Sequence, residues 1–156
     1  MQIETTHLIV RDFLQSDSFD VFYYLKDERV MQYIEPVFNQ EQANEFVHVY
    51  GCVKKMVYAL IEKETNQLIG HIIFHPYDSL DEYEIGWIIK RSSWGKGYAT
   101  EISKALIEYG FHQLKLKRIV AEVVSSNKAA CNVIQKLGMS ENKMRSGTII
   151  RLYELL

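Results

Sequence analysis

The segment with the clearest chemical meaning is a glycine-rich run, Trp94-Gly95-Lys96-Gly97-Tyr98-Ala99-Thr100. It follows an apolar, strand-like run at 83–89 and opens a helical pattern. Glycine lets the backbone approach a phosphate closely, and the unpaired N–H groups at a helix start point at the anion with the helix dipole behind them. The run is therefore typical of a site for a phosphate-bearing cofactor. The alternative is a tight strand-to-helix turn without a ligand.

A dinucleotide-binding loop is the first kind of site to compare. Its pattern is Gly-x-Gly-x-x-Gly/Ala after a strand, with an acidic residue about 20 positions later. Here Thr100 stands at the third glycine position, and the nearest acid, Glu122, lies inside a strand-like run rather than at a strand end. A nicotinamide-dinucleotide enzyme is therefore the less favoured alternative.

Residues 94–99 instead resemble the pyrophosphate loop of the GCN5-related N-acetyltransferase (GNAT) superfamily, whose pattern is Gln/Arg-x-x-Gly-x-Gly/Ala. Residues 127–138 resemble the second cofactor motif of that superfamily, in which an Asn opens a helix that ends in Lys-x-Gly. Residues 3–11 and 70–74 resemble its first and third strands. The resemblance covers essentially the whole chain and is closest to the branch that includes the ribosomal-protein N-terminal acetyltransferases. Trp94 departs from the pattern, which more often has Gln or Arg there.

This resemblance implies an enzyme that uses acetyl-CoA as co-substrate. It would move the acetyl group to a primary amine by direct transfer in a ternary complex, the amine belonging to a protein N-terminus, a polyamine or a small molecule. By the same resemblance, the backbone of residues 95–100 would hold the pyrophosphate, with Trp94 opening this cofactor loop and Lys96 adding charge at its rim, and Asn127 would bond the pantetheine arm. Main-chain N–H groups of Trp87, Ile88 and Ile89, on a strand that is splayed in this superfamily, would face the cofactor and stabilise the developing oxyanion. Asn127 could also serve simply as a helix N-cap.

A base is needed because an amine is protonated near neutral pH. Glu84 is the candidate, since the alternation in residues 82–87 places it on the polar face of an otherwise apolar strand. The alternative is an ordinary solvated or ion-paired glutamate. His71 and His75, on the neighbouring strand or at its end, could approach the same cleft.

The general acid is where this chain departs further from the GNAT pattern that it resembles. Many relatives have a Tyr seven residues after the Asn, and some ribosomal-protein enzymes have a Ser three residues after it. Ile134 and Ala130 occupy these positions here, and neither side chain can donate a proton. The departure keeps a second hypothesis open, a CoA-binding sensor or interaction module without turnover.

Composition narrows the class of protein. The chain has 156 residues, 47% of them hydrophobic, and a net charge of −2, values that predict one globular domain over residues 1–156 with no nucleic-acid or membrane partner. Cys52 and Cys131 have no metal-ligand spacing, so we expect neither a metal site nor a disulfide. The absence of an apolar N-terminal run leads us to expect a cytoplasmic protein, and a homodimer is possible.

The hydrophobic pattern predicts the order β-α-α-β-β-β-α-β-α-β-β, a mixed, mostly antiparallel sheet of about seven strands with helices on both faces, as in the GNAT fold. The expected strands are 7–12, 56–62, 67–74, 82–89, 118–124, 139–145 and 148–155. The expected helices begin near Ser16 and Glu28, and three more are expected over 40–53, after the glycine-rich loop to about Leu114, and over 127–137, with Asn39 as an N-cap and Gly138 as a helix stop.

Overall fold

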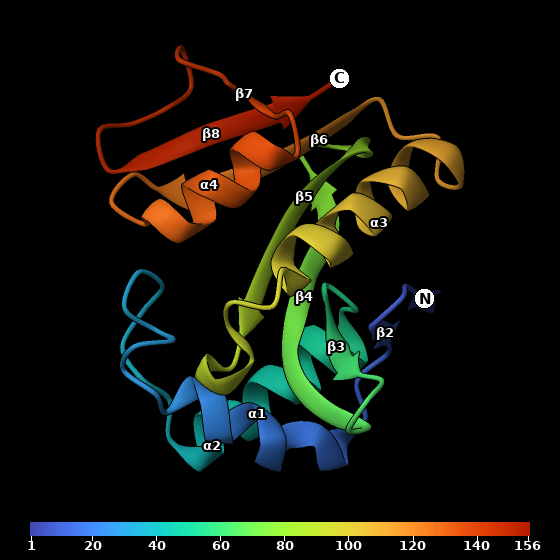
Figure 1. The fold of residues 1–156 in the computed structure, drawn as a ribbon, viewed down its shortest axis with the longest axis vertical. Helices are drawn as coiled ribbons and strands as arrows, with labels where there is room; N and C mark the ends of the chain where they lie inside the picture. The colour runs from blue at the N-terminus through green and yellow to red at the C-terminus, as the bar shows by residue number, and fades with distance from the viewer. The chain divides into compact units, whose positions relative to one another are not determined.

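The structure is a computed structural model that describes residues 1–156 (Figure 1). Eight strands form one sheet in the order β1-β2-β3-β4-β5-β6-β8-β7. The strands are β1 (Ile3–Glu4), β2 (Leu8–Arg11), β3 (Val57–Glu62), β4 (Gln67–Tyr77), β5 (Ser79–Ile89), β6 (Arg118–Val124), β7 (Ser140–Glu141) and β8 (Ile150–Leu155). The four α-helices are α1 (Ser18–Leu25), α2 (Gln40–Phe46), α3 (Tyr98–His112) and α4 (Lys128–Lys136). Three short helical segments are η1 (Gln15–Asp17), η2 (Val47–Val53) and η3 (Arg91–Ser93).

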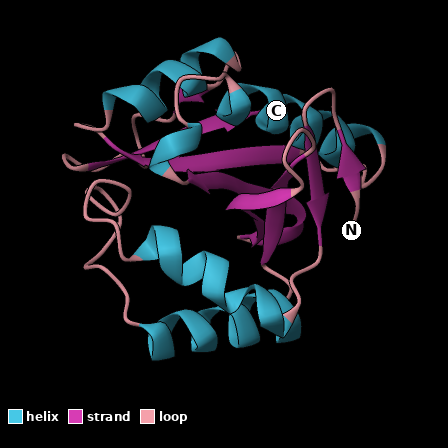
Figure 2. Ribbon diagram, turned by 60° about the horizontal axis from the view of Figure 1, so that its bottom comes forward, coloured by secondary structure: helices cyan, strands magenta, loops and turns pink.

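The chain divides into two compact units, and the first comprises Met1–Ile73 and Trp87–Tyr98. In this unit β1 to β4 pair antiparallel in sequence order. Figures 1 and 2 show α1 and α2 side by side, and Val21, Tyr24 and Leu25 of α1 are buried in the apolar core of the unit. Asn39 caps α2 as predicted, because its side chain accepts from the backbone N–H of Gln42 in a capping box.

The second unit comprises Phe74–Gly86 and Ala99–Leu156. Its β5–β6 pair is parallel, whereas β8 pairs antiparallel with both β6 and β7. Phe74 packs against Tyr83 of β5, with ring centroids 4.8 Å apart, and contacts Tyr109 of α3. Figure 1 shows α4 lying along β6 and β8. Gly138 has a φ of 74° and ends α4, as the sequence predicts.

The predicted fold class is confirmed, with eight strands in place of about seven because Ile3–Glu4 forms a short strand of its own. The helix predicted from Glu28 is wrong, and the segment consists of turns. Asp27 starts a single turn there, since its side chain accepts from the N–H of Arg29 and its carbonyl from the N–H of Met31. The segment predicted as a helix over 40–53 is helical throughout, but α2 ends at Phe46 and continues directly as the π-helix η2.

The two closing strands are shorter than predicted. Asn142 holds the chain between them in a turn, since its carbonyl accepts from the N–H groups of Arg145 and Ser146 and its side chain accepts again from Arg145. These local bonds compete with strand pairing. Only Ser140 and Glu141 therefore remain in β7, and β8 starts at Ile150.

Candidate functional site: a glycine loop and a histidine–glutamate pair

The glycine-rich loop connects η3 to α3, and its two glycines are the residues that shape it. Gly95 has a φ of 78° and Gly97 a φ of 76°, in the left-handed region that side chains rarely adopt. A Cβ atom built on either glycine would have no heavy atom within 4 Å, so the space in front of both is open. Because α3 begins immediately afterwards at Tyr98, this open space lies at the N-terminal end of a 15-residue helix. The local geometry fits a phosphate group approached by backbone N–H groups.

Trp94 holds the start of the loop. Its indole Nε1 donates to the carbonyl of Ile89, the last residue of β5, over 2.7 Å. The side chain remains 48% exposed. Trp94 therefore ties the loop to the strand that precedes it, a role that the family pattern of Gln or Arg does not indicate.

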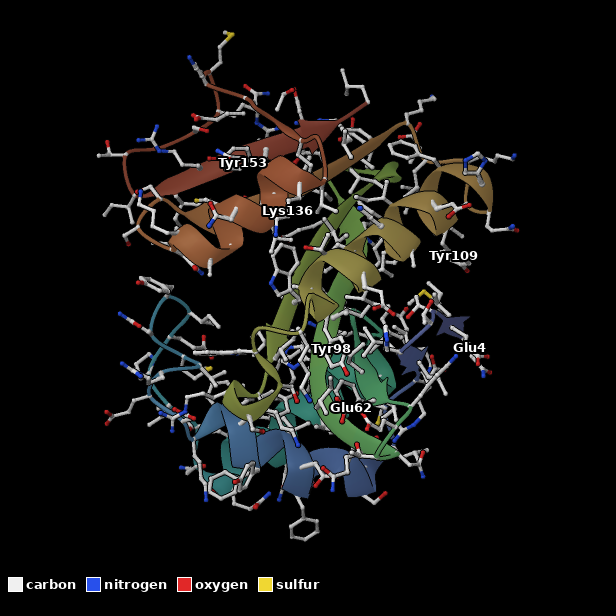
Figure 3. All side chains as sticks on the ribbon, viewed as in Figure 1. Glu4, Glu62, Tyr98, Tyr109, Lys136 and Tyr153 are labelled. Atoms are coloured by element: carbon white, nitrogen blue, oxygen red, sulfur yellow. The ribbon has the colours of Figure 1, made fainter.

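Glu62 is a residue of this region that sequence reasoning missed. It is the last residue of β3 and only 4% exposed. Its Oε2 accepts from the hydroxyl of Tyr98 over 2.7 Å and from Nζ of Lys96 over 3.2 Å, and its Oε1 accepts from Thr65. Figure 3 shows the labelled Glu62 and Tyr98 next to one another. These bonds fix both ends of the Lys96–Tyr98 segment to β3.

The charge of Glu62 also reduces the positive charge that Lys96 can offer to a phosphate group. The Tyr98 hydrogen bond, followed by the bonds from Thr65 and Lys96, outweighs burial and lowers the pKa of the Glu62 carboxyl below its ordinary value. Glu62 is therefore ionised at neutral pH and pairs with Lys96, which also lies over the Tyr98 ring. The positive charge predicted for the rim of the phosphate site is thus shared with a buried carboxylate.

Trp87, Ile88 and Ile89 form the end of β5. The backbone of this end lies so close to Gly70 of β4 that the Ile88 carbonyl would collide with any Cβ at position 70. Lys90 N–H then donates to the carbonyl of Ile69 over 2.8 Å. The parallel register of β5 with β6 comprises only the three pairs from Glu82 to Glu84, ending at Val120. The three residues predicted to face the cofactor come after this register has ended.

Glu84 lies in the paired part of β5 and has a specific partner. Its Oε2 is 3.2 Å from Nε2 of His75, with side-chain exposures of 16% for His75 and 23% for Glu84. The alternation predicted for this strand holds, because Tyr83 packs on Phe74 and Ile85 is buried, while Glu82 bonds Arg118. The hydrogen bond with Glu84 raises the pKa of His75 against the opposing effect of burial, with help from the Pro76 carbonyl.

His71, the other histidine that the sequence analysis singled out, belongs to the core of the first unit. Its Nδ1 is 2.6 Å from the Tyr24 hydroxyl, and the residue is 1% exposed. Burial lowers the pKa of His71 to about 3. The imidazole is therefore neutral at physiological pH, and its hydrogen bond to Tyr24 is a buried structural contact.

Asn127 begins α4 in the second unit. Its side-chain oxygen accepts from the N–H of Ala130 over 3.2 Å, so it is the N-cap of the helix. Ile134, at the position where relatives have Tyr, is fully buried in the core of this unit. The capping role of Asn127 is thus established, and α4 carries no proton donor at either of the two positions that relatives use.

No group of three or more His, Cys, Asp or Glu side chains is arranged to hold a metal ion. None of the helices combines the length and the hydropathy needed to cross a membrane.

Known proteins provide an independent comparison. The model of the acetyltransferase (GNAT) domain family matches residues 7–140. The uncharacterized N-acetyltransferase YnaD of Bacillus subtilis is 38% identical over 140 residues, which cover 89% of this chain and 82% of YnaD. A GNAT-family acetyltransferase from Bacillus anthracis has a crystal structure that is 34% identical, with a TM-score of 0.91 over 100% of this chain and 98% of that one.

A more distant structure shares the fold. RimL, a ribosomal L7/L12 α-N-protein acetyltransferase in complex with coenzyme A, has a TM-score of 0.85 at 15% identity, covering 100% of this chain and 98% of RimL. The family match spans most of the chain and includes the glycine loop, Glu84 and Asn127. We conclude that the chain belongs to the GNAT family of N-acetyltransferases.

Proposed function

We propose that residues 1–156 act as one domain that transfers an acetyl group from acetyl-CoA directly to a primary amine, with both substrates bound at once. Members of the GNAT family acetylate amines with acetyl-CoA, and the family match covers residues 7–140. The observation that carries the proposal is the glycine loop, in which Gly95 and Gly97 have positive φ and open space in front of them. The candidate acceptors are a protein N-terminus, a polyamine and a small amine.

The cofactor contacts follow from the loop and from the family resemblance. Backbone N–H groups of Gly95, Lys96, Gly97, Tyr98, Ala99 and Thr100 would hold the pyrophosphate, in the loop that Trp94 opens. Asn127 would bond the pantetheine arm in addition to capping α4, and the N–H groups of Trp87, Ile88 and Ile89 would face the thioester. We expect Lys96 to contribute little, because Glu62 already neutralises part of its charge and half-exposed charges are screened.

Glu84 is proposed as the base that takes the proton of the attacking amine. Base catalysis needs a group within hydrogen-bond reach of that proton, and Glu84 is a partly exposed carboxylate on the polar face of a central strand. Glu84 has one ion-pair partner, His75, which contacts Oε2. The other carboxylate oxygen, Oε1, forms no salt bridge.

A CoA-binding module without turnover is the second candidate. It is favoured by one observation, the apolar and fully buried Ile134 at the position where many relatives have a proton-donating Tyr. Such a module would bind acetyl-CoA as tightly as an enzyme does but would leave it intact in the presence of amines.

Two measurements test the proposal. Acetyl-CoA should raise the melting temperature, because a ligand that binds only the native state stabilises it, by about 2.7 kcal/mol at a hundredfold excess over Kd. NADH at equal concentration should not. Thiol release from acetyl-CoA should then depend on the presence of an amine from a panel of N-terminal peptides, polyamines and small amines. A melting shift with NADH alone would contradict the cofactor assignment.

A further inference from the structure

His75 has hydrogen-bond partners on both ring nitrogens. Nδ1 is 2.8 Å from the carbonyl oxygen of Pro76, and Nε2 is 3.2 Å from Oε2 of Glu84. A carbonyl oxygen only accepts, so Nδ1 must carry a hydrogen. This contact alone fixes the neutral tautomer of His75 as the one with a bare Nε2.

The Nε2 contact then requires one more proton. An ionised carboxylate only accepts, so Nε2 can bond it only as part of a charged imidazolium. If Nε2 is bare, the carboxyl group must carry the proton instead. In both forms the pair holds one proton between Nε2 and Oε2.

The surrounding charges do not compete for this proton. Glu82, two residues earlier on β5, bonds Arg118 of β6. Glu122 of β6 accepts from the hydroxyl of Tyr77 on β4. Glu84 is the charged group that acts on the His75 imidazole, and its hydrogen bond raises the pKa of His75 above the ordinary 6.5.

We propose that His75 is a positioning residue for Glu84 and that the two side chains act as one proton-holding pair in acetyl transfer. This inference rests on the proposed function. With the shared proton lost, one N–H proton of the amine moves to the Glu84 carboxylate and can pass to Nε2 of His75. The amine nitrogen forms a bond to the thioester carbonyl carbon, and the C–S bond breaks with its electron pair remaining on sulfur.

The pair has a chemical advantage over a lone carboxylate. A lone carboxylate has a pKa near 4.3, far below neutrality, and is a weak base. A base works best when its pKa lies near the working pH. The pair can release its proton from the His75 imidazole, whose pKa the hydrogen bond with Glu84 raises above 6.5, and the imidazole also orients the Glu84 carboxylate.

The first experiment uses the resting protein and needs no turnover. Nitrogen-15 NMR of the imidazole rings should show that Nδ1 of His75 keeps its hydrogen throughout a pH titration, while Nε2 loses its proton at a pKa above 6.5. Glu84→Gln should lower that pKa, whereas Glu108→Gln, an exposed change on α3, should leave it unchanged. His112→Gln, also at an exposed position, should likewise leave the pKa of His75 unchanged. A His75 pKa at or below 6.5 in the unaltered protein, or one that Glu84→Gln does not lower, would overturn the pair.

The second experiment separates orientation from proton sharing. In His75→Asn the amide nitrogen can replace Nδ1 as donor to Pro76, but nothing faces Glu84. In His75→Gln the amide nitrogen can replace Nε2 and hold Glu84 without titrating. In both variants the acidic limb of the kcat/KM pH profile should move to lower pH. Near pH 7 we expect about a tenfold loss of kcat/KM for His75→Asn and a smaller loss for His75→Gln. Melting temperatures check that both variants are folded.

The outcomes distinguish the two proposals. If the unaltered protein acetylates no amine, the proposed function fails, while the NMR titration still decides whether the pair exists. If acetylation proceeds and both His75 variants keep the wild-type limb, the pair fails and the proposed function stands.

Discussion

The hydroxyl of Tyr98 donates a 2.7 Å hydrogen bond to Glu62, so the first residue of α3 is fixed to the last residue of β3. Both side chains are buried, and the acceptor is ionised. Hydrogen bonds to charged groups are stronger than neutral ones, and a buried donor or acceptor left unpaired is costly. The Glu62–Tyr98 bond therefore holds the end of the glycine loop to β3.

Tyr98→Phe removes the hydroxyl and leaves the ring. Because the bond joins a buried donor to a buried carboxylate, the free energy of unfolding should fall by about 1.5–3 kcal/mol, measured by urea denaturation. Tyr23→Phe is the matched control, since Tyr23 is 63% exposed, and should change stability by less than about 0.5 kcal/mol. Equal effects of the two substitutions would contradict the anchoring role of Tyr98.

Glu62 should make stability depend on pH in the acidic range. Its folded pKa lies below the ordinary value of 4.5, so its contribution is complete above the unfolded pKa and is lost as the pH falls through the folded pKa. The stability difference between the unaltered protein and Glu62→Gln should therefore be largest near neutral pH and shrink on acidification below about pH 4.5. A difference that stays constant down to pH 3 or that grows there would be incompatible with this sign.

Gly97→Ala should weaken acetyl-CoA binding by more than its effect on stability accounts for. An added Cβ would enter the open space in front of the loop, and a φ of 76° is strained for alanine by about 1 kcal/mol. Gly138→Ala is a close control, because Gly138 has a φ of 74° and equally open space but lies at the end of α4. Isothermal titration should show a loss of affinity of at least tenfold for Gly97→Ala and little change for Gly138→Ala. Equal affinities for the two variants would argue against a phosphate site at the loop.

The parts of this structure that the sequence predicts are those governed by neighbouring residues. The cap at Asn39, the stop at Gly138 and the alternation around Glu84 each involve residues a few positions apart. The glycine loop belongs to the same class, since both its positive φ values and the following helix start are local features.

The contacts that the sequence does not predict join distant segments. Glu62 has the appearance of an ordinary polar residue before a turn, and its two loop partners follow 34 and 36 positions later. The partner of Glu84, His75, lies on the preceding strand, nine positions earlier in the sequence. Pairing across strands depends on the register of the two strands. The hydrophobic pattern shows which face of the sheet a side chain is on, but not which residue of the next strand lies opposite it.

The most direct test of the central claim is the rate at which an acetylated amine forms, followed by mass spectrometry, for the unaltered protein and for Glu84→Gln at saturating acetyl-CoA. We predict acceptor-dependent product with the unaltered protein, and a kcat lower by about 100-fold or more for Glu84→Gln, because the variant keeps its size but cannot accept a proton. Its affinity for acetyl-CoA should be nearly unchanged. Tight binding of acetyl-CoA by both proteins with no acetylated amine from either would contradict the account and identify a CoA-binding module.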